Sequence, residues 1–348
     1  MRGVVGHEVA HAAQVVPAAL TTDLGERVQP DERLFTVADR EALAASARLV
    51  PRVAEGDPIE VEGGEEAKTL ASAEELLGRL VRAGIRRDDA IVAFGGGVVG
   101  DLAGFCAGVY QRGIPVVHVP TTLVAQVDSA YGGKTGVDLP EAKNYVGAFH
   151  HPSAVLADPD ALETLPAAEL TAGFAEVVKT ALIAGGSLWG RVRVIEHLDP
   201  ATVAPLVFDC ARTKIEIVAA DEREGGRRAV LNLGHTVGHA IETASGYGRY
   251  RHGEAVAIGM LAALRLSEAG ELRAEVAGLF ERTGLPTALD PSIDVDAIVE
   301  AVGRDKKQTA EGIGFVLAAA PGDVREGQRI DGDSLRDSVI ELQGQSGG

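Results

Sequence analysis

The pattern of apolar and polar positions divides the chain into two halves. From about residue 34 to 160, short apolar runs that end at Gly, Pro or Asp alternate with segments of helical period. The runs typical of strands are RLFTVAD, AIVAFGG, IPVVHVPTT and AVLAD, and SAEELLGRLVRAGI is typical of an amphipathic helix behind a Ser cap. Strands spaced by helices predict a parallel, doubly wound sheet.

From about residue 161 onward the apolar period is helical nearly throughout. The clearest segments are AEVVKTALIAG, TVGHAIETA, GEAVAIGMLAALRLSEAG and EVAGLFERTGL. We therefore predict an α/β, Rossmann-like nucleotide domain over residues 1–160 and an all-α domain over residues 161–348. Residues 1–33 are poorly patterned and receive no role, and no internal repeat is evident.

Composition narrows the class of protein. A chain of 348 residues with 46% apolar residues and no low-complexity run is typical of a globular protein with two cores. The net charge of −18 argues against a nucleic-acid partner, because phosphate backbones require a basic face. No apolar stretch is long enough for a membrane span, and no signal-peptide layout is present. We expect a cytoplasmic protein in which Cys106 and Cys210 are buried thiols.

Lysine is rare in this chain. Of 33 basic residues, the lysines are Lys68, Lys134, Lys143, Lys179, Lys214, Lys306 and Lys307. Lys is a compact ammonium that can be desolvated, whereas Arg is a planar fork. A chain that prefers Arg at its surface is expected to keep Lys where a point charge contacts a phosphate, hydroxyl or carboxylate. The alternative is that a bias in the nucleotide composition of the gene disfavours lysine codons and that the remaining lysines are placed at random. Most of the lysines lie beside polar clusters that suit phosphate and metal chemistry.

A glycine-rich turn follows the strand run AIVAF and precedes a helical run. Its sequence, GGGVVGD at residues 95–101, fits the dinucleotide pattern in which pyrophosphate approaches backbone amides at a helix N-terminus. The ribose-binding acid of a standard Rossmann unit would follow about 20 residues later, where Pro120, Thr121 and Thr122 stand instead. Any bound nicotinamide dinucleotide must therefore have its ribose held by other residues. Packing alone is the alternative role of such a turn.

Three histidines and an acid suggest a metal site. NLGHTVGHA places His235 and His239 four residues apart on one helical face. His252 follows at the expected start of another helix, and Glu176 precedes Lys179 by three residues. Two imidazoles and one carboxylate, with one position open, are the usual ligands of catalytic zinc, which would polarise substrate hydroxyls. The alternative is that these histidines cap helices or pack in the core.

A second motif points to a different class. HEVAH at residues 7–11 matches the helix pattern of zinc proteases. It lies close to the N-terminus, and no third ligand stands out downstream. We interpret this five-residue pattern as a chance match.

The densest polar stretch is VPTTLVAQVDSAYGGKTGVDLPEAKNYVGAFHHP. Together with GGGVVGDLAGF, GFAEVVKT, DEREGGRRAVLNLGHTVGHA, HGEAVAIG and RDKK, it resembles the 3-dehydroquinate synthase family of sugar-phosphate cyclases. The resemblance covers about residues 60–320, in order and with the family's spacing. It implies an NAD- and zinc-dependent lyase, with cobalt as another suitable ion, whose active site lies between an α/β and a helical domain.

The resemblance also assigns roles to individual positions. The positions for NAD are Asp39, Glu65, Lys68, Gly96, Gly97, Val98, Gly100, Asp101, Thr121, Thr122, Lys134, Lys143, Leu162 and Thr164. The metal-ligand positions are Glu176, His235 and His252. The substrate and catalytic positions are Asp128, Lys134, Asn144, Lys179, Lys214, Arg228, Asn232, His239 and Lys306, with Arg112 reaching across a homodimer interface.

These roles imply a reaction on an anionic, phosphorylated small molecule. Arg228 with Lys214 would hold a carboxylate, which suits the Arg fork. The phosphate would be held by Lys134, Asn144, Asn232, Lys306 and Arg112. Hydride would pass to NAD, phosphate would be eliminated with His239 nearby, hydride would return, and an intramolecular aldol would close the carbocycle. The implied conversion is 3-deoxy-arabino-heptulosonate 7-phosphate to 3-dehydroquinate.

The chain departs from the family pattern at three positions. Glu41 stands where Asn is expected after Asp39, Tyr131 replaces a small aliphatic residue, and Asp138 replaces a common Asn. Such changes fit an aminodehydroquinate synthase of an aminohydroxybenzoate antibiotic pathway, whose substrate carries nitrogen in place of oxygen. The sequence leaves open the choice between the oxo and amino substrates and the native divalent metal.

Two further hypotheses belong to other classes. A metal-dependent polyol or alcohol dehydrogenase shares the fold and a Gly-Gly-Gly turn, and it would release NADH stoichiometrically. A degenerate paralogue would bind the nucleotide only. The second is disfavoured because every named catalytic position carries a suitable residue.

Overall fold

The structure is a computed structural model that describes residues 15–17, 33–46, 57–246, 248–304, 308–309 and 312–344. Lys306 and the HEVAH motif at residues 7–11 lie outside the described residues. The chain divides into two compact units. The N-terminal unit comprises residues 1–165 and 214–219, and the C-terminal unit comprises residues 166–213 and 220–348. The sequence analysis predicted two domains with a boundary after residue 160, and this division into domains stays a prediction.

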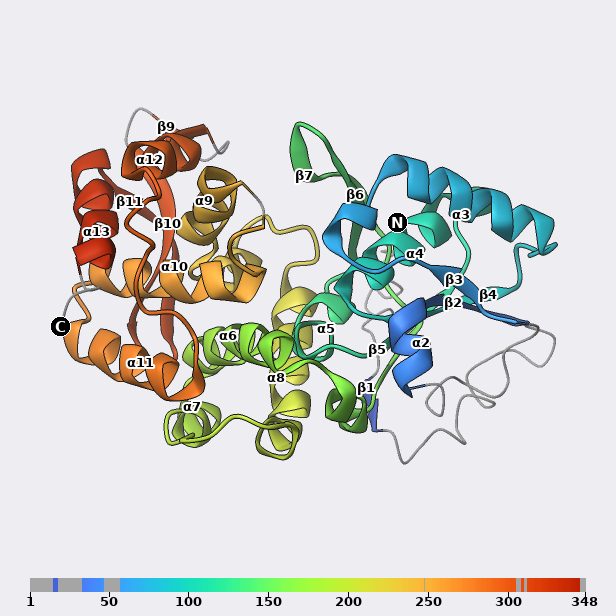
Figure 1. Ribbon diagram of the computed structural model, residues 1–348, viewed down its shortest axis with the longest axis horizontal. Helices are drawn as coiled ribbons and strands as arrows, with labels where there is room; N and C mark the ends of the chain where they lie inside the picture. Colours follow the sequence, from blue (N-terminus) through green and yellow to red (C-terminus); the bar gives the residue numbers. More distant parts are fainter. Residues whose placement is uncertain are drawn as a thin grey trace, which may run out of the picture. The chain divides into compact units, whose positions relative to one another are not determined.

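A six-stranded sheet forms the centre of the N-terminal unit (Figure 1). Its strands are β1 (Val15–Pro17), β2 (Leu34–Asp39), β3 (Ile59–Val61), β4 (Ala90–Gly95), β5 (Val116–Pro120) and β8 (Ala154–Ala157). The strand order is β1-β8-β5-β4-β2-β3, and all neighbours run parallel. The predicted parallel sheet is confirmed. The order reverses between β2 and β4, and ligands of such sheets bind at the carboxyl ends of the strands at this point.

Helices cover both faces of this sheet. Those of the N-terminal unit are α2 (Arg40–Ser46), α3 (Leu70–Arg82), α4 (Gly97–Val109) and α5 (Leu123–Val127). On one face, α3 and α4 pack against the strands with buried side chains such as Leu76 and Leu102. On the other face, α2 packs against Leu34 and Phe94. Each such fully buried side chain contributes about 1.5–3 kcal/mol of transfer free energy.

The predicted Ser cap of α3 is wrong. The helix begins at Leu70, and its N-cap is Thr69, whose side chain accepts a hydrogen bond from the backbone N–H of Ser72 at 3.1 Å. Ser72 therefore lies inside the first turn. Thr69 therefore satisfies one of the free donors in the first turn of the helix.

The polar stretch after β5 folds into short elements. These are the 3-10 helices η5 (Ser129–Tyr131) and η6 (Pro159–Thr164) and an antiparallel hairpin of β6 (Lys134–Leu139) and β7 (Ala142–Phe149). Two other 3-10 helices of this unit are η3 (Glu65–Ala67) and η4 (Tyr110–Arg112). The sequence analysis did not predict this hairpin. The prediction that Cys106 and Cys210 are buried thiols is confirmed, and neither forms a disulfide among the described residues.

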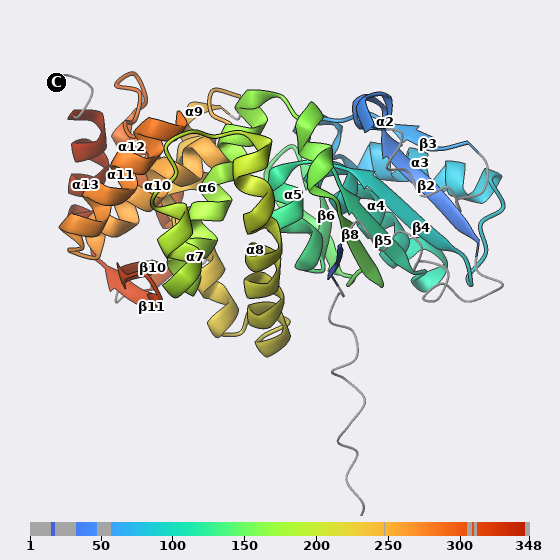
Figure 2. The same cartoon turned by 90° about the horizontal axis from the view of Figure 1, so that it is seen from below.

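The C-terminal unit is mainly helical, as predicted (Figure 2). Its helices are α6 (Ala167–Ala184), α7 (Gly186–Val192), η7 (Arg227–Asn232), α9 (His235–Ser245), α10 (His252–Leu266), α11 (Gly270–Thr283), α12 (Val295–Arg304) and α13 (Gly332–Gly344); α8 (Pro200–Ala220) contributes residues to both units. Helix α10 contacts α6, α9, α11 and α13, and it is buried from Ala255 to Leu264. A helix that is apolar all round belongs in a core.

The description of this unit as all-α is incomplete. Strands β9 (Gln308–Thr309), β10 (Gly312–Ala320) and β11 (Asp323–Ile330) form an antiparallel sheet. A nine-residue apolar run such as that of β10 suits a buried helix as well as a strand, so its period did not separate the two. The turn between β10 and β11 is fixed by a hydrogen bond from the N–H of Gly322 to the carbonyl of Leu182 at 2.7 Å. Among the described residues, no helix is long and apolar enough to cross a bilayer.

Candidate active site

The glycine-rich turn connects β4 to α4 at the carboxyl edge of the sheet. Gly96 is the N-cap of α4, which has no side-chain cap, so the first amides of the helix are not bonded by a capping side chain. A Cβ atom at Gly96 would lie 2.9 Å from Cγ2 of Thr122, so only glycine fits without a shift. A pocket lies at this turn, lined by Ala93, Gly95, Gly96, Gly97, Gly100, Asp101, His118, Pro120, Ala125, Ser129 and Ala130. The turn thus combines free amides, missing side chains and a pocket, which suits a pyrophosphate.

Residues that the sequence analysis assigned to NAD gather near this turn. Asp39 ends β2, and its Oδ1 accepts a hydrogen bond from the N–H of Ala42 at 2.7 Å. Its Cβ lies against Gly95, since a Cβ added there would be 3.2 Å away. Thr121 donates its N–H to the carbonyl of Gly95 at 2.9 Å, and Thr122 caps α5. The acid of β2 and the threonines after β5 therefore flank the turn on both sides.

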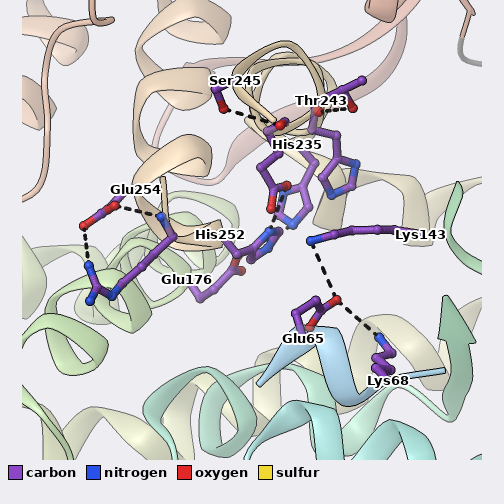
Figure 3. Close-up of polar contacts among 12 residues, drawn as sticks. Glu65, Lys68, Lys143, Glu176, His235, Thr243, Ser245, His252 and Glu254 are labelled. Atoms are coloured by element: carbon purple, nitrogen blue, oxygen red, sulfur yellow. Dashed lines mark hydrogen bonds and ion pairs between the residues drawn. The ribbon is translucent and has the colours of Figure 1, made fainter. Parts of the chain in front are cut away.

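A charged cluster surrounds Lys68 (Figure 3). The buried ammonium of Lys68 lies 2.6 Å from Oδ2 of Asp101 and 3.9 Å from Oε1 of Glu65, and it donates to Oδ1 of Asn144. The ammonium of Lys143 lies 3.8 Å from the same Glu65 oxygen. Burial disfavours the charge on Lys68, but the carboxylates of Asp101 and Glu65 outweigh it and raise the pKa of Lys68. The predicted cofactor residues of this region thus form one connected network.

Other predicted cofactor positions lie in η6, α4 and β6. Leu162 is fully buried in η6, where the hydroxyl of Thr164 donates to the carbonyl of Ala161 at 3.2 Å. Val98 lies in the first turn of α4 and is not among the pocket-lining residues. Lys134 begins β6 and is exposed. The cofactor roles of these residues stay predictions.

Asp128 and Lys214, both predicted substrate residues, lie together in the N-terminal unit. The ammonium of Lys214, on α8, is 2.8 Å from Oδ2 of Asp128, which follows α5. Lys214 is only 7% exposed, so the carboxylate compensates a buried charge. The two residues are more than 80 positions apart in the sequence, and only the fold brings them together.

In the C-terminal unit, donors from three helices converge (Figure 3). Glu176 is on α6, His235 begins α9 and His252 begins α10. Oε1 of Glu176 lies 3.6 Å from Nε2 of His235 and 3.5 Å from Nε2 of His252. Two ligands of a tetrahedral ion with bonds of about 2.0–2.1 Å are about 3.3 Å apart. The spacing of these donors therefore suits a divalent ion such as zinc.

A second donor set overlaps with the first. The ring nitrogens of His235, His239 and His252 lie within 4.8 Å of one another, and the ring centroids of neighbouring pairs are 5.3–5.8 Å apart. A three-histidine site is thus an alternative to Glu176, His235 and His252. The two sets share His235 and His252 and differ in whether Glu176 or His239 completes them.

The surroundings of Glu176 favour the donor set that includes it. Its side chain is 1% exposed, and neither carboxylate oxygen has a hydrogen-bond partner among the described residues, although Oε2 forms an ion pair with Lys179 one turn along α6. Burial opposes its charge, but Lys179, His235 and His252 hold the pKa of Glu176 well below its ordinary value. A buried carboxylate that faces two imidazole nitrogens is a suitable ligand for a cation.

The two histidines differ in their charge states. Burial, reinforced by the charge of Lys179, holds the pKa of His235 well below its ordinary value. Burial also disfavours the charge on His252, but Glu176 and Glu242 outweigh it and raise the pKa of His252 to about 10. A metal ion that binds here must therefore displace a proton from His252, which couples its affinity to pH.

Close backbone packing brings α6 and α10 together. A Cβ atom at Gly253 would lie 1.8 Å from the carbonyl oxygen of Ala172, so α10 can approach α6 this closely only with glycine at that position. Gly253 directly follows His252, and Ala172 precedes Glu176 by one turn of α6. The absence of one side chain thus determines the distance between two of the donors.

A tight loop positions Arg228, which the sequence analysis assigned to a substrate carboxylate. Asp221 accepts hydrogen bonds from the N–H groups of Gly225, Gly226 and Arg228 at 2.8–3.0 Å, and these bonds lower the pKa of Asp221. The guanidinium of Arg228 is 2% exposed and donates to the carbonyl of Glu222 at 2.5 Å. This loop therefore holds Arg228 in a single orientation.

Sequence reasoning missed two acids in this unit. Glu224 has a positive φ of 59° and accepts a hydrogen bond from Nδ2 of Asn232 at 2.6 Å. Glu242 lies 3.4 Å from Nδ1 of His252. Glu242 follows His235 and His239 on one helical face, and this spacing is a signal that could have identified it.

Arg112 and the departures from the family pattern are placed as follows. Arg112 is exposed and has a positive φ of 71°, and its role at a dimer interface stays a prediction. Tyr131 is 1% exposed, so its side chain packs inside the N-terminal unit. Oδ1 of Asp138 accepts a hydrogen bond from the N–H of Asn144, which has a positive φ of 54°, at 2.6 Å. Asp138 thus positions a predicted substrate residue.

Known proteins share both halves of this arrangement. Residues 58–172 match the N-terminal domain of 3-dehydroquinate synthase, and residues 173–308 match its C-terminal domain. The 3-dehydroquinate synthase of Symbiobacterium thermophilum is 45% identical over 336 residues, which cover 94% of this chain and 90% of the relative.

Two solved structures are similar over nearly the whole chain. A 2-deoxy-scyllo-inosose synthase complexed with carbaglucose-6-phosphate, NAD+ and Co2+ has a TM-score of 0.84 and 26% identity, with 95% of this chain and 97% of that one covered. The 2-epi-5-epi-valiolone synthase of Streptomyces hygroscopicus, with NAD+ and Zn2+ bound, has a TM-score of 0.85 and 25% identity, with 98% and 99% covered. The matches to both domains and the identity to a curated relative show that this chain belongs to the 3-dehydroquinate synthase family.

Proposed function

We propose that this protein is a 3-dehydroquinate synthase, a sugar-phosphate cyclase that converts 3-deoxy-arabino-heptulosonate 7-phosphate to 3-dehydroquinate and phosphate. The observation that carries the proposal is the convergence of Glu176, His235 and His252 in a chain that is 45% identical to a 3-dehydroquinate synthase. The names of the curated relatives favour the oxo substrate over the amino analogue.

We propose NAD and a divalent ion, Zn2+ or Co2+, as cofactors. The free amides and missing side chains at Gly96 suit the dinucleotide, and the spacing of the Glu176 and histidine donors suits the ion. When bound, the dinucleotide supplies a hydride acceptor and donor, and the ion supplies a Lewis acid for the substrate hydroxyls.

The chain's own residues bind and orient the substrate in this proposal. Arg228, held by its loop, and Lys214 bind the carboxylate. Because Lys214 already pairs with Asp128, substrate binding gives Lys214 a second anionic partner in place of the first. Lys179 and Asp128 orient the hydroxyls. The phosphate is held by the amides and cations of Asn144, Asn232, Lys134, Lys306 and Arg112. We propose that His239, which is exposed beside His235 and His252, exchanges a proton with the substrate.

Assembly and location are part of the proposal. Arg112 is exposed, as a residue that reaches a second copy of the chain must be, and we propose a homodimer. We propose a cytoplasmic enzyme whose small-molecule substrate is anionic. Size-exclusion chromatography with light scattering would test the dimer.

A single assay separates this function from its rivals. The purified protein, supplied with NAD and Zn2+ or Co2+, is incubated with 3-deoxy-arabino-heptulosonate 7-phosphate, and phosphate, 3-dehydroquinate and NADH are measured. We expect equal amounts of phosphate and 3-dehydroquinate and no net NADH, because the hydride returns within each turnover. NADH that accumulates without phosphate would indicate a dehydrogenase, and NAD binding without any reaction would indicate a degenerate paralogue. Faster turnover of the imino substrate in a parallel assay would favour an aminodehydroquinate synthase.

A further inference from the structure

Helix α9 carries a third polar residue on the face that bears His235 and His239. Glu242 follows them at the i, i+4, i+7 spacing that aligns side chains along one face of a helix. Its side chain is buried, with 7% exposure for the residue. Oε2 of Glu242 lies 3.4 Å from Nδ1 of His252, the first residue of α10.

The two ring nitrogens of His252 face two different carboxylates. Nε2 lies 3.5 Å from Oε1 of Glu176, on the side of the donor cluster (Figure 3). Nδ1 lies 3.4 Å from Oε2 of Glu242. A neutral imidazole that offers the lone pair of Nε2 to an ion carries its proton on Nδ1. Glu242 is placed to accept that proton in a hydrogen bond. The imidazole ring itself stands between Glu242 and the cluster.

His235 has a different partner behind its ring. Its Nδ1 lies 3.2 Å from the backbone carbonyl of Leu233, while its Nε2 faces Glu176. Both histidines therefore present Nε2 to the same carboxylate and have an acceptor at Nδ1. The acceptor of His235 is a neutral carbonyl from its own chain segment, and that of His252 is a charged side chain from another helix.

We propose that Glu242 is a positioning residue for His252, which orients its ring with Nε2 toward the divalent ion and makes that nitrogen a stronger ligand. Partners of this kind behind metal-bound histidines affect metal affinity by about 10- to 100-fold. The inference rests on the metal site of the proposed function and deepens it. It also gives a reason for a buried acid at this position of α9.

The test compares Glu242→Gln and Glu242→Ala with the wild-type protein. Co2+ affinity is measured by competition with a chelator, and the visible d–d absorption of the Co2+ form reports the ligand field. We expect Glu242→Ala to weaken Co2+ binding by about 10- to 100-fold. Glu242→Gln should weaken it less and shift the d–d bands, because an amide oxygen still accepts the Nδ1 proton but carries no charge.

Glu254→Gln is the matched control. Glu254 lies two residues after His252 on α10, and its carboxylate accepts a hydrogen bond from the N–H of Arg251 at 2.8 Å without contacting the ring. Neutralising this acid should leave Co2+ affinity and the d–d bands unchanged. Thermal unfolding of the metal-free variants shows whether a loss of affinity reflects a loss of folding instead.

Two negative results are distinguishable. A wild-type protein that binds no Co2+ would overturn the metal site of the proposed function. A wild-type protein that binds Co2+, together with a Glu242→Gln variant of equal affinity and unchanged spectrum, would overturn the role of Glu242 alone. The Gln variant gives this answer even if Glu242→Ala does not fold.

Discussion

The two units use glycine for opposite purposes. At Gly96 of the N-terminal unit, an added Cβ would meet a side-chain methyl of Thr122 at 2.9 Å, beside the free amides of α4. At Gly253 of the C-terminal unit, it would meet the backbone carbonyl of Ala172 at 1.8 Å. In the proposed function the first glycine keeps space for the dinucleotide, and the second lets two helix backbones come together. The proposed binding surface and the helix junction therefore both depend on glycine, but they differ in how well they tolerate an added side chain.

The charged groups differ in a parallel way. In the N-terminal unit Lys68 pairs with Asp101, and Lys214 pairs with Asp128. In the C-terminal unit one buried acid, Glu176, faces Lys179 and two histidines. The first arrangement compensates charge before a ligand arrives, and the second concentrates donors around one point.

The largest effect is expected for Gly253→Ala. The backbone of α6 cannot rotate away as a side chain can, so α10 must move and His252 must separate from Glu176. We expect the free energy of unfolding in urea to fall by about 3 kcal/mol and bound metal to be lost. The control is Gly190→Ala on α7, where an added Cβ meets nothing within 4 Å and stability should be unchanged or slightly higher. Normal stability and metal content in Gly253→Ala would contradict the close-packing argument.

Glu176→Gln and His239→Ala come next, because they separate the two possible donor sets. If Glu176, His235 and His252 bind the ion, Glu176→Gln should lose both metal and turnover. His239→Ala should keep its metal and lose about 10²–10⁴-fold in turnover, the range for removal of a general acid or base. Metal content by mass spectrometry and phosphate release are the measurements. Loss of metal in His239→Ala with retention in Glu176→Gln would establish the three-histidine set instead.

Gly96→Ala should have a smaller effect, which sharpens the contrast with Gly253. Thr122 can adjust its side chain, so we expect a loss of stability of under about 1 kcal/mol. The new methyl group occupies the space beside the amides, so NAD affinity, measured by fluorescence titration, should fall about tenfold, or about 1.4 kcal/mol. Adding Thr122→Ser removes the nearest methyl and should restore part of the affinity. Unchanged NAD binding in Gly96→Ala would show that the dinucleotide lies elsewhere.

His118→Gln should have the smallest effect at neutral pH and a clear one in acid. His118 lies on β5 beneath α4, and burial, with a contribution from His150, lowers its pKa to about 4. Its ordinary value is about 6.5, so between pH 6.5 and pH 4 the unfolded chain binds a proton that the folded chain does not. Stability is therefore fully present above pH 6.5 and falls as the pH decreases toward 4. Urea unfolding at several pH values should give a shallower decrease in the Gln variant; parallel curves would show that His118 is not kept neutral.

Much of the fold could be predicted from local patterns. The strands β2, β4, β5 and β8 and the main helices follow from apolar period and turn residues. The two hairpins could not be predicted in this way. In the β6–β7 hairpin, β6 is mostly buried and β7 is half-exposed, and neither strand alternates strictly between apolar and polar residues. Strand β10 is apolar throughout, so its period does not exclude a helix.

The site was predictable where its residues are neighbours in the sequence. The pairing of Glu176 with Lys179 and the shared face of His235 and His239 follow from helical spacing. The contacts of Lys68 with Asp101 and of Glu242 with His252 connect different elements, and no local pattern contains them.

By itself, the sequence determined the family, the parallel sheet followed by a helical unit, the glycine-rich turn and the types of residue that bind ligands. These properties depend on residue identity and on spacing within one helix or one strand. Only the tertiary structure decided that α6, α9 and α10 place a carboxylate oxygen within 3.6 Å of two imidazole nitrogens. It also decided which acid lies behind His252. The physical reason is that distances between helices depend on how closely their backbones pack, as at Gly253, and packing is a property of the folded chain.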